Sequence, residues 1–345
     1  MQMSLPRWAR RPPGSNWGEF GSEDQIGRMN LLTPERRLKG FQQVRTGEVF
    51  CLSLPLDLPG GNAIFPFRKP PCLHAEARGS SVNYNYPFKE LSSEFTDVIS
   101  DDAVTLYTQY STQWDALGHA GQYFDVNDDG APVKVYYNGY RADHDIRGPG
   151  GDAPHSGSPH AGALSIDRLA TTCVQGRGWL VNLKSIYGQT HHLVTYDDLM
   201  HAIERDGVAV ETGDILCIYT GTADLIIEMA GDPDPDKLRN SCAVLDGRDD
   251  ALLRWVDDSG LVAICSDNLA VEAYPARPGV GDHYASLPLH EHCLFKLGIH
   301  LAELWYFEEL AAWLARNGRS SFLLTAPPLR LPGAVGSPVT PVATV

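Results

Sequence analysis

The chain has 345 residues, and 43% of them are hydrophobic, which is enough to bury the core of one large domain. A formal net charge of -15 and the lack of a long basic run argue against nucleic acid and anionic membrane surfaces as partners, and favour a small molecule or another protein. The cysteines are scattered and form no C-x-x-C pair, and no segment has the apolar run of a signal peptide or membrane span, so we expect a reduced, cytoplasmic chain.

The N-terminal part of the chain is rich in turns but carries one clear helix signal. Thr33, Pro34 and Glu35 supply an N-cap, a proline at the first helical position and an acid in the first turn. A strand is expected at 48–54. Residues 59–93 are dense in Gly, Pro, Asn and Ser, and we expect a long ordered loop over a pocket or at an oligomer contact. The aromatic residues that could line this pocket or anchor the loop are Phe65, Phe67, Tyr84 and Tyr86.

The middle of the chain contains a short alternating pattern and a long irregular segment. Residues 104–110 alternate apolar and polar side chains, as a half-buried strand does. The polar segment 109–119 would then begin at a strand end and run into a turn or short helix. Residues 141–162 contain many Gly, Pro and His residues without periodicity, and we interpret them as a lid or an oligomer-contact loop.

The second half of the chain alternates helical and strand patterns, and Thr195 and Asp198 form a capping box. The expected helices are 165–171, 195–205, 248–257, 290–297 and 306–316, and the expected strands are 178–183, 215–219, 261–265, 299–304 and 321–325. This alternation predicts a single α/β domain over 1–345 with a mostly buried sheet. Asp267 and Glu272 follow one of these strands and are interpreted mainly as residues that tie loops together.

Residues 109–119 read QYSTQWDALGH and carry the most informative pattern in the chain. They resemble the cassette H-x-G-T-H-x-D-x-x-x-H of the cyclase family, whose better-known members are kynurenine formamidase and isatin hydrolase. Asp115 and His119 stand where that family keeps two metal ligands, whereas Gln109 and Gln113 replace its two leading histidines. An Asp and a His four residues apart are a weak signal on their own, so the rest of the chain has to support the resemblance.

A second segment, from His290 to Glu303, matches the family frame H-x-x-L-L-x-x-x-G-I-x-x-x-E, which supplies a downstream His and Glu as ligands. His292 and His300 compete for the histidine position, and we favour His290 because its distance from Gly298 fits the frame. The other similar segments are the stretch from NWG to LLTPE, GRGWLVNL, ETGDILCIYTG, SDNLAVE and PPLRLPGAVGSPVTPVA. The resemblance thus covers nearly the whole chain. It implies the swivelling β/β/α cyclase-like fold with a mixed central sheet, and a homo-dimer or homo-tetramer.

The resemblance also implies one divalent metal ion, zinc or manganese, held by Asp115, His119, His290 and Glu303. A cation is the simplest way to neutralise two acids and two histidines brought together in a buried cluster. An amide oxygen is a neutral and weak ligand for zinc, so the two glutamines of the cassette leave a further metal position of the family empty or weakened.

The predicted function is hydrolysis of a small cyclic or aromatic amide or lactone. The ion would polarise the carbonyl and lower the pKa of bound water towards about 7, with His119, Gln113 and Glu303 as the catalytic groups. The residues assigned to substrate binding are Gln109, Thr112 and Trp114. The tryptophan fits either a core position or an aromatic wall for a ring substrate.

Three alternatives stay open. In a metal-free mechanism, His119 is a general base held by Asp115 or Glu303, and the glutamines hold the carbonyl oxygen. The same site could serve a lyase or a cyclase, or the chain could be a catalytically inactive binding protein. The sequence has no G-x-S-x-G elbow, no phosphate-binding loop and no G-x-G-x-x-G motif, which disfavours serine hydrolases of the elbow type, nucleotide hydrolases and dinucleotide enzymes.

Overall fold

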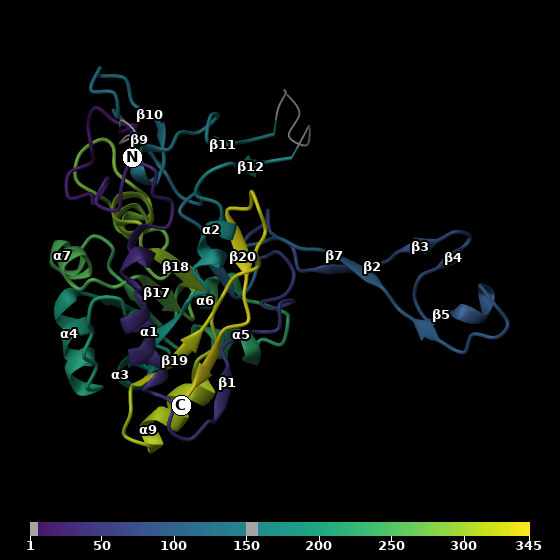
Figure 1. Cartoon of the computed structure of the whole chain (residues 1–345). Helices are drawn as coiled ribbons and strands as arrows, with labels where there is room; N and C mark the ends of the chain where they lie inside the picture. Colours follow the sequence, from purple (N-terminus) through teal and green to yellow (C-terminus); the bar gives the residue numbers. More distant parts are fainter. Residues whose placement is uncertain (1–5, 150–157) are drawn as a thin grey trace.

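The computed structural model describes residues 6–149 and 158–345, and a nine-stranded mixed sheet forms its centre (Figure 1). The strands in spatial order are β1 (Val49–Cys51), β21 (Val342–Thr344), β19 (Ser321–Thr325), β13 (Gln175–Asn182), β15 (Ile215–Tyr219), β17 (Ala263–Ser266), β18 (His300–Glu303), β8 (Gln113–Asp115) and β20 (Gly336–Pro338). The neighbours β13, β15, β17 and β18 run parallel, and the outer pairs are antiparallel. The five strands predicted in the second half of the chain are therefore confirmed: 215–219 and 321–325 match, and the ends of the other three are shifted.

The sheet is buried on both faces, which explains why its central strands are almost wholly apolar. Leu216 and Ile218 of β15 pack in one hydrophobic cluster, together with side chains of α4 (Tyr196–Arg205) and α7 (Asp250–Asp258). Ile215 and Cys217 of the same strand point to the other face, where they pack with side chains of α2 (Ile166–Thr171) and α9 (Glu308–Arg316). Alternate residues of one strand thus contribute to two separate cores.

Two helices begin where their capping signals place them. The side-chain oxygen of Thr33 caps α1 (Pro34–Phe41), and Thr195 and Asp198 form the predicted capping box of α4. The predicted helix 290–297 is split into α8 (Pro288–His290) and a π-helical segment, η4 (Glu291–Leu297), which ends at Gly298 in the left-handed conformation. The remaining helices are α3 (Lys184–Tyr187), α5 (Thr222–Glu228) and α6 (Pro235–Arg239), with the short 3-10 turns η1 (Gly27–Leu31), η2 (Phe88–Glu90) and η3 (Tyr137–Gly139).

A two-stranded arm extends from the body (Figure 1) and corrects two expectations. Its base pairs β2 (Cys72–Ala75) with β7 (Asp102–Thr105). Residues 59–93 are therefore no single loop over a pocket, because 72–93 leave the body in this arm. The strand predicted at 104–110 ends at Thr105, since the chain turns there as it returns from the arm to the body. The short strands of the arm beyond its base are β3 (Ala77–Arg78), β4 (Ser81–Val82), β5 (Tyr86–Pro87) and β6 (Val98–Ile99).

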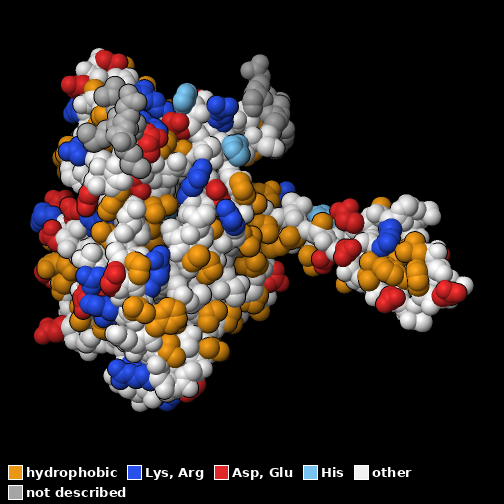
Figure 2. Space-filling model, in the orientation of Figure 1, with side chains coloured by type: hydrophobic (Ala, Val, Ile, Leu, Met, Phe, Trp, Pro, Cys, Tyr) orange, Lys and Arg blue, Asp and Glu red, His pale blue; other side chains and the backbone are white. Residues whose placement is uncertain are grey.

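The arm exposes apolar side chains that a water-facing ribbon would not be expected to carry. Leu73 and Val104, which pair across β2 and β7, are 71% and 48% exposed, and Val98 is 60% exposed. Figure 2 shows hydrophobic side chains gathered on the arm. Near its tip, the guanidinium of Arg78 lies over the ring of Tyr86. A hairpin of this kind has little stability of its own in water, so its exposed faces are suited to a contact with another molecule.

The remaining short strands lie outside the central sheet, and they are β9 (Gln122–Phe124), β10 (Val133–Val135), β11 (Ile146–Arg147), β12 (His160–Ala161), β14 (His192–Val194) and β16 (Ala243–Leu245). β11 and β12 form a small ladder within the predicted lid or contact segment 141–162, of which residues 150–157 lie outside the described part of the chain. The role of that segment stays a prediction. In the described ranges, no helix has the length and apolar character needed to cross a membrane.

Candidate functional site

Two acids and a histidine meet at one edge of the central sheet. Asp115 ends β8 and Glu303 ends β18, and these two strands are antiparallel neighbours, with Gln113 opposite Glu303. His290, the last residue of α8, reaches the same place: its Nε2 lies 3.3 Å from Oε1 of Glu303 and 3.9 Å from Oδ2 of Asp115. One ligand atom from each of Asp115, His290 and Glu303 lies within 4.8 Å of the others, and all three residues are buried.

His119 stands at the rim of this cluster. Its Nε2 lies 3.8 Å from Oδ1 of Asp115, and its side chain is 25% exposed, whereas Asp115 is fully buried. The structure therefore brings all four predicted ligands together, with three in a compact buried group and His119 between that group and solvent. His292 and His300, the competing histidines, are not part of the group found among the described residues.

The group holds two buried acids whose charges repel each other. Burial and the neighbouring charge of Asp115 raise the pKa of Glu303, although His290 acts in the opposite direction. Burial alone would lower the pKa of His290, but its hydrogen bonds with Glu272 and Glu303 outweigh burial and raise it. Oδ2 of Asp115 is buried without a hydrogen-bond partner. A divalent ion among these donors would satisfy that oxygen and offset the repulsion of the two acids, so the residues fit the metal.

Glu272 is the main contributor to the site whose role the sequence did not reveal. Its Oε1 lies 2.8 Å from Nδ1 of His290, and its carboxylate also accepts the backbone N–H groups of Leu289 and His290. This contact holds the proton on Nδ1 and turns Nε2 towards the acids, the arrangement of many metal-binding histidines. Asp267, in contrast, does tie loops together, because it accepts the N–H groups of Thr220 and Gly221.

Gln113 faces the cluster, and Gln109 lies beside it. Nε2 of Gln113 donates to Oε2 of Glu303 at 2.8 Å and lies 3.5 Å from Oδ1 of Asp115, while its own side-chain oxygen is buried without a partner. The amide of Gln109 packs against the α-carbon of Gly336, which is paired with Asp115 across β20 and β8 and has no room for a side chain. Gln113 thus acts on the acids as a neutral donor.

Two residues assigned to substrate binding, Thr112 and Trp114, lie in the core, and for Trp114 this is one of the two positions that the sequence allowed. Trp114 is fully buried, its Nε1 donates to the carbonyl of Ala326, and its ring packs edge-on against Trp305. The cause is strand alternation: Gln113 and Asp115 point to one face of β8, so Trp114 points to the other. Thr112 is also fully buried, and its hydroxyl bonds to the backbone of Leu54 and Leu304.

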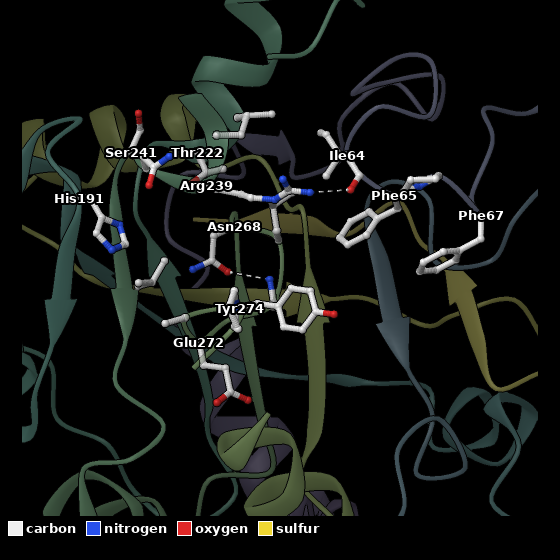
Figure 3. Close-up of a pocket in the computed structure, with 18 residues that line it drawn as sticks. Ile64, Phe65, Phe67, His191, Thr222, Arg239, Ser241, Asn268, Glu272 and Tyr274 are labelled. Carbon is white, nitrogen blue, oxygen red and sulfur yellow. Dashed lines mark hydrogen bonds between the residues drawn. The ribbon is translucent and has the colours of Figure 1, made fainter. Parts of the chain in front are cut away.

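Two hollows lie next to the cluster. One, of about 350 Å³, is lined by His290 and by residues 120–122, which directly follow His119. The other, of about 470 Å³, has Glu272 among its lining residues, and in Figure 3 the carboxylate of Glu272 points away from the aromatic rings. Phe65 and Phe67 line one side of this larger cavity, which includes no residue of the cassette 109–119. Tyr84 and Tyr86 lie on the arm.

Comparison with known proteins places the chain in a family. The Cyclase family model, described as "Putative cyclase", matches residues 52–273, and the chain belongs to this family. The crystal structure of a novel cyclase superposes with a TM-score of 0.74 and 30% identity, over 97% of this chain and 100% of that chain. The predicted family and the α/β cyclase-like fold with a mixed central sheet are thereby confirmed.

More distant structures share the fold. Isatin hydrolase A from Labrenzia aggregata bound to benzyl benzoate superposes with a TM-score of 0.53 and 12% identity, over 86% of this chain and 93% of that chain. An isatin hydrolase bound to the product analogue thioisatinate superposes with a TM-score of 0.53 and 16% identity, over 91% of this chain and 99% of that chain. No curated protein matches the chain.

Proposed function

We propose that the protein hydrolyses a small cyclic or aromatic amide or lactone, and that a single divalent ion, zinc or manganese, is held by Asp115, His290 and Glu303 with His119 at the rim. The observation that carries the proposal is the buried convergence of the first three side chains, together with the unpartnered oxygen of Asp115. The distant likeness to isatin hydrolases supports hydrolysis over the other reactions of such a site. An ion bound there would polarise a carbonyl group and make water more acidic.

The chain's own residues supply the proton chemistry and the positioning. Burial and the charge of His290 lower the pKa of His119, although Asp115 opposes them, so His119 is neutral near pH 7 and its ring is able to take a proton from water. Glu272 fixes the orientation of His290. Gln113 holds the carboxylate of Glu303 through its amide N–H group. Two hollows, one lined by His290 and residues 120–122 and the other by Glu272 and two phenylalanines, offer a small substrate room beside the cluster.

Metal analysis of the purified protein, combined with assays on a panel of aromatic amides and lactones, tests this proposal. We expect about one tightly held zinc or manganese ion per chain, and hydrolysis that is lost on chelation and regained on adding the ion. Metal-free protein that still hydrolyses the panel would support the acid/base mechanism through His119 instead. Metal-containing protein that eliminates water or closes a ring would support a lyase or cyclase, and metal-free, inert protein would support a binding protein.

We also propose that the chain forms a homo-dimer or homo-tetramer through its arm. Cys72 and Thr105 are directly paired at the arm's base, so an Asn-Gly turn can replace 73–104 without disturbing the body. We expect this variant to be monomeric by light scattering and to keep its metal content. A milder variant, Leu73→Ser with Val104→Ser, should weaken association as well. A wild-type monomer, or an unchanged assembly in the deletion variant, would show that the arm has another role.

A further inference from the structure

Arg68 is an arginine beside the site that no sequence motif singled out. Its Nη1 donates to the backbone carbonyl of Gln109, the first residue of the cassette, at 2.7 Å. Its guanidinium lies 4.5 Å from the ring centre of Phe65 and 5.8 Å from that of Phe67. Both rings line the larger cavity (Figure 3). Arg68 therefore contacts both the cassette and two rings that line the cavity, but it is not itself one of the cavity's lining residues.

The position of Gln109 connects Arg68 to the acidic cluster. The amide of Gln109 packs against Gly336, and Gly336 pairs directly with Asp115.

Arg68 has no carboxylate partner. Among residues 6–149 and 158–345, no Asp or Glu forms an ion pair with it, and its side-chain hydrogen bond in that part of the chain goes to the neutral carbonyl of Gln109. The residue is only partly exposed. A half-buried guanidinium with most of its N–H donors free is a common binding group for carboxylates, which it meets with two parallel hydrogen bonds.

We propose that Arg68, stacked on Phe65 and close to Phe67, binds a carboxylate of the substrate, so that the enzyme acts on aromatic carbonyl compounds that carry an anionic group. This inference rests on the proposed hydrolase function only in so far as it calls the ligand a substrate. Binding of a carboxylate at Arg68 does not depend on turnover. The aromatic side of the cavity receives the ring, and the guanidinium receives the carboxylate.

A pair of fluorescent probes tests the proposal on the full-length protein as purified. The first probe is 2-naphthoate, and the second is 2-naphthamide, which has nearly the same shape but no charge. We expect the wild type to bind the carboxylate about tenfold more tightly than the amide or better. Arg68→Gln should remove this preference. Arg68→Lys should keep part of it, because lysine has the charge without the planar fork.

Lys69→Gln is the matched control, since it removes the same charge from the adjacent, exposed residue. It should bind both probes as the wild type does. The proposal is overturned if the wild type does not distinguish the probes, if Arg68→Gln keeps the preference, or if Arg68→Gln weakens both probes equally, which would indicate that Arg68 only anchors the loop. If the wild type hydrolyses no amide or lactone of the panel but still prefers 2-naphthoate to 2-naphthamide, the proposed function is wrong and the carboxylate-binding site stands.

Discussion

Replacing Glu303 by Gln is expected to abolish tight metal binding and, at the same time, to make the metal-free protein more stable. The affinity for zinc or manganese should fall by more than about 100-fold, because the variant loses an anionic ligand. The metal-free variant should gain on the order of 1 kcal/mol in unfolding free energy at pH 8, since burial and the charge of Asp115 disfavour the ionised form of Glu303 in the folded state. Such opposite effects are typical of a residue kept for function rather than stability.

The raised pKa of Glu303 also sets how the unfolding free energy of the metal-free protein depends on pH. The folded-state pKa of Glu303 is raised above its unfolded value, so the folded metal-free protein holds this proton more tightly and loses stability as the pH rises from the ordinary glutamate range through the raised pKa. The variant lacks this loss, and its advantage over the wild type should grow with pH across that interval.

Urea unfolding of chelator-treated protein at several pH values, with metal titrations in parallel, would measure both effects. Glu309→Gln is a suitable control, because Glu309 is exposed on α9 and should change neither quantity. A metal-free Glu303→Gln protein that is less stable than the wild type at pH 8 would contradict the interpretation of a repulsive buried cluster.

Replacing Glu272 by Gln should have the second largest effect on metal affinity and stability, although Glu272 is not among the proposed ligands. The carboxylate accepts three hydrogen bonds, from the backbone of Leu289, from the backbone of His290 and from the ring of His290. An amide has one accepting oxygen and would turn an N–H group towards these donors. We expect metal affinity to fall by about 10- to 100-fold and stability to fall by about 2 kcal/mol.

The ring nitrogens of His290, followed by NMR in the metal-free protein, provide a measurement that a general loss of stability would not change. In the wild type the imidazole pKa should lie above its usual range, and once the ring has lost one proton at higher pH, the remaining proton should be on Nδ1. In Glu272→Gln the pKa should fall, because one of the carboxylates that raises it is gone. Glu291→Gln, which removes a neighbouring charge that pairs with Lys296, is the control. An unchanged pKa and metal affinity in Glu272→Gln would mean that other contacts orient His290.

Local patterns were good predictors where a short segment decides its own structure. The cap at Thr33 and the capping box at Thr195 mark helix starts because each satisfies free backbone N–H groups within one turn. The apolar runs of β15 and β17 indicate strands buried on both faces. The arm was not foreseen, because its strands are short and its Gly, Pro and Ser content looks like that of a loop.

The sequence left Trp114 between a core position and a pocket wall for a related reason. The strand that carries Asp115 is only three residues long, too short for alternation to show in the sequence. Only the strand at 113–115 places Trp114 opposite Gln113 and Asp115, in the core. No local pattern points to Arg68, because it lies in the segment with the least periodicity, and its position follows from tertiary contacts with Gln109, Phe65 and Phe67.

The sequence alone determined the family, the alternating α/β order and the residue types of the acidic cluster, because these depend on motifs and on short-range periodicity. The tertiary structure decided which of those residues meet. Pairing of β8 with β18 brings Asp115 next to Glu303, and the packing of α8 against Glu272 turns His290 towards both. Such contacts depend on strand register and side-chain direction over long sequence separations, which no local pattern encodes.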